Sequence, residues 1–122
     1  MKQRNRIVKV FLCTMMSAVL LSSPAMSSEE ESSSIAKGKK LAFDRKKGNC
    51  LACHAIEGGS LAGSIGPALI VMKLRYPDRD KIRAKIWDAT QSNQQSVMPP
   101  FGKNRVLSNE EIEHVINYLY SL

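Results

Sequence analysis

The chain has 122 residues and carries 18 Lys and Arg against 11 Asp and Glu, a formal net charge of +7. Part of this excess lies in the first ten residues, which hold four basic residues and no acid: Lys2, Arg4, Arg6 and Lys9. Without them the balance is 14 basic against 11 acidic residues, or +3, a modest excess that suits docking to acidic partners. These basic residues open an export signal, and an exported protein does not meet nucleic acid in its compartment, which excludes a nucleic-acid-binding role. The roughly 96 residues that follow the signal are enough for one small domain.

The first 25 residues have the pattern of a secretory signal peptide. Basic residues come first, an apolar run covers residues 10–21, and small residues lead up to Ala25. Cleavage is expected near residues 25–27, which also removes Cys13 from the mature chain. The apolar run is well short of the ~20 residues that cross a bilayer, which argues against a retained membrane anchor. We therefore predict a periplasmic protein with no membrane span after cleavage.

The first part of the mature chain predicts a lead-in, a helix and a long loop. Residues 27–34 contain no apolar side chain, and we expect a disordered lead-in over residues 26–34. The helical spacing of Ile35, Gly38, Leu41 and Ala42 predicts a helix from about residue 35 to residue 46, with Gly48 as its stop. Residues 55–70 are rich in glycine and small side chains, which is typical of loops and turns.

Two more helices are predicted in the second half of the chain. Pro77 and Asp78 begin a helix that runs to about Thr90, and a polar loop over residues 91–96 leads into residues 97–102. Residues 108–111 form a capping box, and the last helix then carries one apolar stripe of Ile112, Val115, Ile116 and Leu119. No strand pattern is present. The predicted fold class is all-α, with one domain over residues 35–122.

The chemistry of the chain lies in a Cys-x-x-Cys-His motif formed by Cys50, Cys53 and His54. This motif attaches a c-type haem, because both thiols can form thioethers with the vinyl groups and the adjacent imidazole can coordinate the iron. Two intervening residues let one turn of chain span the two vinyl groups, and the following His then lies under the metal. The sequence therefore predicts one covalently bound haem c with His54 as an axial ligand.

Three other interpretations of the cysteines are weaker. A plain disulfide is the usual interpretation of two cysteines in an oxidising compartment, but it leaves His54 unexplained. A structural zinc site needs four ligands, and the only other His or Cys of the mature chain is His114. We expect His114 to be solvated, since it projects from the polar side of the last helix. A thioredoxin-like redox pair requires a βαβ context that this helical pattern lacks.

The second axial ligand has four candidates: Met26, Met72, Met98 and His114. Met26 lies at the extreme N-terminus, and Met72 is better explained as a core residue, the usual role of a methionine at a helical position. Met98 is followed by two prolines, which bar it from a helix and hold it extended in a loop. We therefore predict that Met98 presents its thioether to the iron opposite His54.

Two residues are expected to support the haem. The carbonyl of Pro67 could accept a hydrogen bond from Nδ1 of His54 and so set its tautomer, although Pro67 could equally be an ordinary turn proline. Trp87 lies beside the apolar face of its helix and is expected to pack on the haem or in the core. The basic stretch over residues 37–47 could steer an acidic partner to the haem edge, although such charges are most often only a solvated face.

These features together resemble the class I cytochrome c family. The residues that carry the resemblance are the motif at residues 50–54, Gly66 and Pro67, the loop at Met98 and Pro99, and the final helix around Leu119. The resemblance implies a helical domain wrapped around one haem, with N- and C-terminal helices that cross beside it. Gly38 and Leu41 fit the small-residue crossing of that family, whereas Ala42 stands where many members have an aromatic side chain.

A narrower resemblance covers nearly the whole mature chain. Several blocks are similar to the SoxX family of small monohaem cytochromes: residues 47–56, 66–67, 72–79, 86–89, 97–102 and 110–112. The resemblance implies a periplasmic subunit that forms a heterodimer with a SoxA-type cytochrome. It also implies that the complex is an L-cysteine S-thiosulfotransferase, which couples thiosulfate oxidatively to a cysteine of the SoxYZ-type carrier.

In this interpretation the chain itself supplies no catalytic residue. Its haem, held by Cys50, Cys53, His54 and Met98, takes up electrons and passes them to a soluble cytochrome. The alternative is a free-standing periplasmic electron carrier, which shares all the general features of a small cytochrome. Only the narrower resemblance separates the two.

Overall fold

The computed structural model describes residues 28–122, and the predicted signal peptide and its cleavage zone lie outside the described residues. The described part is helical and contains no strand. Its α-helices are α1 (Ser28–Phe43), α2 (Met72–Arg75), α3 (Arg79–Asp88) and α4 (Asn109–Tyr120), and two short 3-10 helices are η1 (Cys50–Ala52) and η2 (Ala89–Gln91). The all-α prediction is confirmed. Within residues 28–122, no helix combines the length and the apolar character that crossing a membrane requires.

Helix α1 differs from its predicted bounds at both ends. It begins at Ser28, so the expectation of disorder is wrong for residues 28–34, where three consecutive glutamates in the first turn complement the helix dipole. It ends at Phe43, three residues before the predicted end. The side chain of Asp44 accepts a hydrogen bond from the backbone N–H of Lys46, which offers the chain a turn in place of another helical residue.

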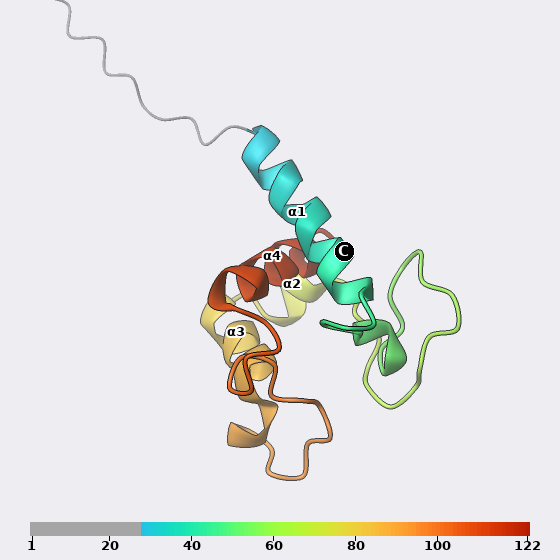
Figure 1. Cartoon of the computed structure of the whole chain (residues 1–122), viewed down its shortest axis with the longest axis vertical. Helices are drawn as coiled ribbons and strands as arrows, with labels where there is room; N and C mark the ends of the chain where they lie inside the picture. The colour runs from blue at the N-terminus through green and yellow to red at the C-terminus, as the bar shows by residue number, and fades with distance from the viewer. Residues whose placement is uncertain (1–27) are drawn as a thin grey trace, which may run out of the picture.

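Helices α1 and α4 cross, and this crossing joins the two ends of the domain (Figure 1). Gly38 lies at the crossing point, where a Cβ atom would fall 1.9 Å from the carbonyl oxygen of His114. The rings of Phe43 and Tyr118 then meet edge to face, with their centroids 6.3 Å apart. The small-residue crossing expected at Gly38 is therefore present, and Phe43 supplies the aromatic contact that Ala42 cannot make.

His114 is also part of this crossing, and the expectation that it is solvated is wrong. Its side chain is only 17% exposed, and its Nδ1 is joined to the hydroxyl of Ser34 by a 2.7 Å hydrogen bond. Asn117 donates a second hydrogen bond to the same hydroxyl. Helix α1 covers the side of α4 that carries these residues, so a side that is polar in sequence is buried in the fold.

Helix α4 has the predicted cap and the predicted apolar face. Ser108 accepts from the backbone N–H of Glu111, and Glu111 accepts in return from the backbone N–H of Ser108, which completes the capping box. The four residues of the stripe, Ile112, Val115, Ile116 and Leu119, are all buried. They form the centre of the core.

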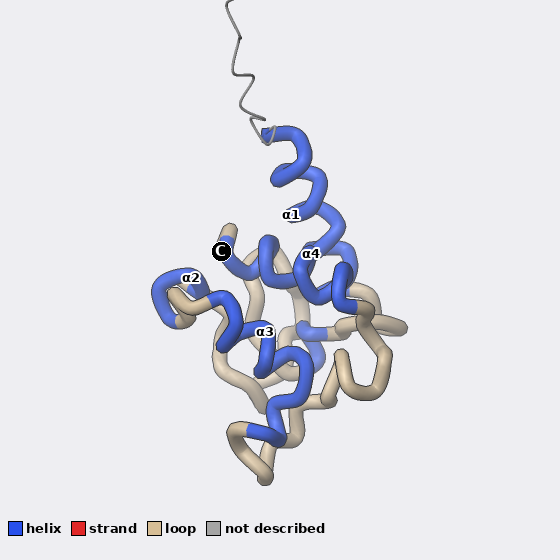
Figure 2. The backbone as a smooth tube through the Cα atoms, turned by 90° about the vertical axis from the view of Figure 1, so that its left-hand side faces the viewer, coloured by secondary structure: helices blue, strands red, loops and turns tan. Residues whose placement is uncertain are grey.

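Helices α2 and α3 cover the other side of the core (Figure 2). Helix α2 is a single turn that was not predicted, and α3 begins two residues later than expected, with Asp78 as its N-cap. Several contacts tie these elements to α4: for example, Arg79 pairs with Glu113, and the hydroxyl of Tyr120 donates to the carbonyl of Tyr76. Two long loops, over residues 53–71 and 92–108, are left beside this helical frame.

Candidate functional site

A cavity of about 790 Å³ lies between the two long loops and the helical frame. The motif segment around η1 forms one wall, and the loop with Met98 forms another. Buried core side chains, among them Ile82, Ile86 and Leu119, close the interior end. A volume in this range suits a bound organic group, and the lining is mostly apolar.

A tight turn places the three motif residues together on the cavity wall. The carbonyl of Cys50 accepts hydrogen bonds from the backbone N–H groups of Cys53 and His54, at 3.2 and 2.9 Å. The residue before this turn, Asn49, has a left-handed backbone with φ of 43°, a conformation that asparagine tolerates better than most residues. Both thiols and the imidazole therefore line the same cavity.

Burial controls the state of the first thiol. It raises the pKa of Cys50 to about 11, so this thiol stays protonated at neutral pH in the free protein. Gly48 allows the close packing behind it, because a Cβ there would lie 2.7 Å from the carbonyl oxygen of Leu41 and 3.3 Å from Sγ of Cys50. The two cysteines are not joined to each other.

The imidazole of His54 is held from behind by the loop that follows it. Its Nδ1 donates to the carbonyl of Pro67 over 2.6 Å, so the predicted hydrogen bond is present. Gly66 packs directly on the ring, where a Cβ would come within 2.3–2.8 Å of three ring atoms. With Nδ1 engaged as a donor, Nε2 is the nitrogen that remains free to bind a metal.

Met98 and Met72 both line the cavity, but their sulfur atoms have different neighbours. Met72 is 4% exposed and opens α2, and Nη1 of Arg75 lies 3.5 Å from its Sδ. Met98 stands in the loop between η2 and α4, half-buried, next to Pro99, which also lines the cavity. No hydrogen bond in the described part of the chain engages its sulfur.

The loop that carries Met98 is fastened to the end of α3. The carbonyl of Trp87 accepts from the backbone N–H groups of Gly102 and Lys103, and a Cβ at Gly102 would fall 2.0 Å from the indole ring. The ammonium group of Lys103 also lies 3.0 Å from the buried carboxylate of Asp88. Trp87 packs against the core behind this loop and is not among the residues that line the cavity, so of its two expected roles it takes the core one.

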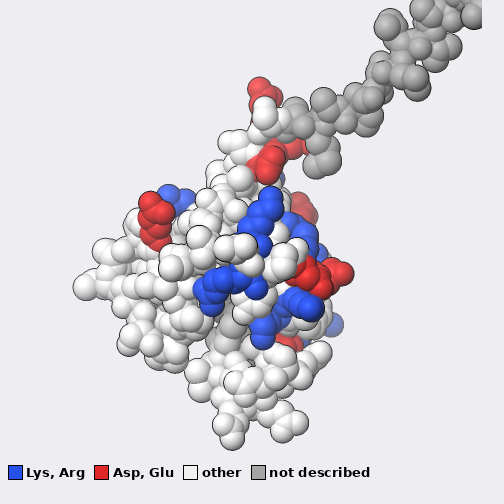
Figure 3. All heavy atoms as spheres, turned by 180° about the vertical axis from the view of Figure 1, so that it is seen from behind, with Lys and Arg blue, Asp and Glu red and all other residues white. Residues whose placement is uncertain are grey.

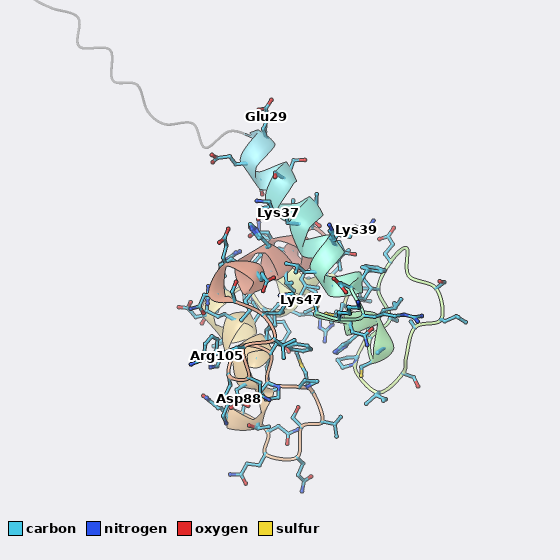
Figure 4. All side chains as sticks on the ribbon, in the orientation of Figure 1. Glu29, Lys37, Lys39, Lys47, Asp88 and Arg105 are labelled. Carbon is cyan, nitrogen blue, oxygen red and sulfur yellow. The ribbon has the colours of Figure 1, made fainter. Side chains whose placement is uncertain are left out.

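Sequence reasoning missed Asp88 and Lys103, because neither residue belongs to a motif and both are ordinary in composition. Thr90 lowers the pKa of Asp88 by donating a hydrogen bond to it, and Lys103 lowers it further. Figure 4 shows Asp88 at the lower end of the helical frame, near the loop that it fastens. The signal that could have found this pair is the short polar turn after Asp88, where Thr90 returns to its carboxylate.

The charges around the cavity are of one sign. Four basic residues line it and, among the described residues, no acid does: the four are Arg45, Lys47, Arg75 and Lys85. Lys47 also pairs with Glu111 at 2.9 Å. The pKa of the Glu111 carboxyl group is lowered mainly by the hydrogen bond that it accepts from the Ser108 backbone, and next by Lys47. A haem combines a flat apolar ring with two carboxylates, so an apolar cavity with basic residues, two thiols and a free imidazole nitrogen fits it.

The same residues fit poorly to the zinc alternative. Within residues 28–122, no group of three or more His, Cys, Asp and Glu side chains is placed to hold a metal ion. His114, the ligand that a zinc site would have needed, is bonded instead to Ser34 at the crossing of α1 and α4.

Comparison with protein families agrees with this geometry. The family model described as Cytochrome c matches residues 35–122. The chain belongs to the cytochrome c family. Membership implies a covalently bound haem c and a role in electron transfer, and Cys50, Cys53 and His54 are the residues that fit the attachment. A search of curated proteins finds no match to this chain.

Proposed function

We propose that this cytochrome is the electron-accepting, SoxX-like subunit of a periplasmic SoxAX-type complex. In this proposal Cys50 and Cys53 would hold the haem, and His54 and Met98 would bind its iron. When bound, the haem supplies a reversible one-electron acceptor. The observation that carries the electron-accepting role is the cavity itself, which brings two thiols, an oriented imidazole and a thioether together in an apolar lining.

Contacts within this chain would hold the two proposed iron-binding side chains, His54 and Met98, in place. The Pro67 carbonyl holds the proton of His54 on Nδ1, which leaves Nε2 as the coordinating atom. The anchored loop that carries Met98 keeps this residue among those that line the cavity. Thioether ligation raises the reduction potential, which suits a group that accepts electrons.

The family blocks favour the SoxAX role over a free-standing carrier, and these blocks lie close to the site. Arg75 donates to the carbonyl of Ala68 and so joins α2 to the loop behind His54. Asp78 caps α3, and the Tyr76 carbonyl accepts from Tyr120. Residues 72–79, one block of the resemblance, thus connect elements that line the cavity.

In the proposed reaction the carrier's cysteine thiol loses its proton and bonds to the terminal sulfur of thiosulfate, which releases two electrons. A haem held by Cys50, Cys53, His54 and Met98 would supply a one-electron acceptor, so the SoxA-type cytochrome or the soluble cytochrome would have to take the second electron. This chain would contribute no reacting cysteine of its own, because the only cysteines in residues 28–122 are Cys50 and Cys53, which would hold the haem; the resemblance assigns the reacting cysteine of the enzyme to the SoxA-type subunit.

Reconstitution tests this proposal. The haem-loaded chain, a SoxA-type partner, the SoxYZ-type carrier, thiosulfate and an oxidised soluble cytochrome are mixed, and acceptor reduction and the mass of the carrier are followed. We expect reduction and a mass gain only when both cytochromes are present. Full activity of the SoxA-type partner alone, or no binding between the two cytochromes, would instead leave this chain as a free-standing carrier.

Met98→Ala tests whether electrons pass through the haem of this chain. The variant should slow electron uptake and leave the heterodimer intact, because Met98 acts on the iron. A fully active Met98→Ala variant would mean that this haem does not lie on the catalytic route.

A further inference from the structure

The exposed apolar side chains of this domain are not scattered. Within residues 28–122 six large hydrophobic residues are more than half exposed, and we call them the apolar face: Leu61, Ile65, Ile70, Val71, Leu74 and Val97. Five of them fall between residues 61 and 74, and the sixth is next to Met98. Single exposed apolar residues are common on proteins, but a group confined to two segments points to an interaction surface.

Two members of the apolar face lie at the cavity. Ile65 and Val97 line the cavity from its two different loops. No charged residue occurs from residue 58 to residue 72 or from residue 89 to residue 102, which are the segments that carry most of the face. Figure 3 shows the result on one side of the molecule: Lys and Arg gather in a middle band, with uncharged surface beside and below it.

Two residues of the face have a backbone conformation that is unfavourable for their side chains. Leu61 and Val71 have φ of 58° and 45°, in the left-handed region that favours glycine and asparagine. Leu61 is 98% exposed, so its side chain contributes almost nothing to the folded core. An asparagine at either position would lower the backbone strain and expose less apolar surface. Folding therefore does not account for these side chains, whereas a bound partner does.

The residues beside the face indicate the charge of that partner. Lys73 and Arg75 are exposed and flank Leu74, and no acid occurs from residue 58 to residue 77. Arg45, which lines the cavity, is also exposed. A second copy of this chain would set these basic residues against each other, whereas a surface with carboxylates at its edge would pair with them.

We propose that the apolar face docks a redox partner through a matching apolar patch fringed by carboxylates. This inference rests on the proposed function, in which the partner is the SoxA-type subunit. Docking there would cover the loops that carry Ile65 and Val97 and bring the partner's redox group close to the cavity. The inference assigns recognition mainly to residues 61–74 and Val97, with Arg45 as the contributor from the basic stretch over residues 37–47.

The test uses the double variant Leu61→Asn and Val71→Asn in the haem-loaded protein. Asparagine accepts the left-handed backbone, so the variant should unfold at a Tm roughly 2–5 °C higher than the parent chain. Its Kd for the SoxA-type subunit, measured by calorimetry, should rise about tenfold or more, because two apolar contacts are lost. A higher Tm together with weaker binding is a result that damage to the fold cannot produce.

Arg105→Asn is the matched control. Arg105 also has a left-handed backbone, with φ of 56°, and it is exposed but does not line the cavity. Figure 4 shows it across the molecule from the loop of residues 57–71. This variant should gain stability in the same way and bind the SoxA-type subunit with unchanged affinity.

Other outcomes overturn the inference in distinguishable ways. Unchanged binding by the double variant, with normal binding by the parent chain, removes the apolar face as the docking site and leaves the proposed function intact. Failure of the parent chain to bind the SoxA-type subunit removes both. Unchanged partner binding with a loss of self-association, or of attachment to anionic phospholipid vesicles, would assign the face to a second copy or to a membrane and would also overturn the proposal.

Discussion

Gly66 is the residue whose replacement should most directly disturb His54, the proposed iron ligand, without removing it. A Cβ at this position would lie 2.3 Å from Cε1 of His54, about 1.1 Å closer than the 3.4 Å of an ordinary contact. In Gly66→Ala the ring must therefore move by about 1 Å. Its hydrogen bond to the Pro67 carbonyl is 2.6 Å long, and a movement of that size away from the oxygen would take it to about 3.6 Å, beyond hydrogen-bonding distance.

The magnitude of this change follows from two contributions. Overpacking of a close contact costs about 1–3 kcal/mol, and the lost hydrogen bond adds about 0.5–1.5 kcal/mol. The sum, about 1.5–4.5 kcal/mol, corresponds to a fall in Tm of roughly 6–36 °C at about 4–8 °C for each kcal/mol in a domain of this size. The absorption spectrum of the ferric protein should also change, because the ring no longer has its orienting partner.

Thermal unfolding and absorption spectra of the haem-loaded variant measure both effects. Gly58→Ala is the control, since a Cβ there would meet nothing within 4 Å and only the left-handed backbone, with φ of 75°, opposes it. It should cost about 1 kcal/mol and leave the spectrum unchanged. If Gly66→Ala kept the parent Tm and spectrum, the contact between residue 66 and the imidazole would not be as close as described, and the reasoning would be refuted.

Three further predictions test the ligand, the crossing and the loop anchor. Met98→Ala should abolish the weak red sulfur-to-iron charge-transfer band of the ferric protein and Met72→Leu should keep it; the opposite result would transfer the ligand role to Met72. Gly38→Ala should lower Tm by about 5 °C or more, because the new Cβ would overlap the carbonyl of His114. This effect should outweigh the helix propensity of alanine, which is about 1 kcal/mol more favourable than that of glycine. A higher Tm would contradict the close crossing of α1 and α4. The folded-state pKa of Asp88 is lowered, so its carboxylate stabilises the fold above about pH 4 and loses that effect as pH falls through the folded pKa. The Tm of Asp88→Asn should therefore lie below that of the parent chain at pH 7 and converge with it in acid. A difference in Tm that stays constant with pH would count against the lowered pKa.

The features that could be predicted from sequence depend on residues close together in the chain. The capping box of α4 joins Ser108 to a residue three positions later, and the motif turn joins Cys50 to His54. The bond from His54 to Pro67 spans only 13 residues, within one loop. In each case the chemistry of a short segment determines its own geometry, so a pattern in the sequence carries enough information.

The features that were missed depend on contacts between distant segments. Ser34 is bonded to His114 across 80 residues, and this pairing makes α1 longer and His114 more buried than their own sequences suggest. Lys103 reaches Asp88 across a loop, and neither residue is unusual by itself. The polarity of a side chain indicates whether exposure to water is favourable for it, but not which other segment of the chain will pack over it.

The two methionines show how the two kinds of information combine. Both line the cavity, so burial alone does not choose between them. Met72 is held in a helical turn with a guanidinium nitrogen 3.5 Å from its sulfur, and to bind the iron it would give up that contact. Met98 lies in a loop that its prolines extend, and the hydrogen bonds of Gly102 and Lys103 to Trp87 fasten the end of that loop. An available sulfur on an anchored loop needs little rearrangement to meet the metal, and this is the physical reason to favour Met98 as the ligand opposite His54.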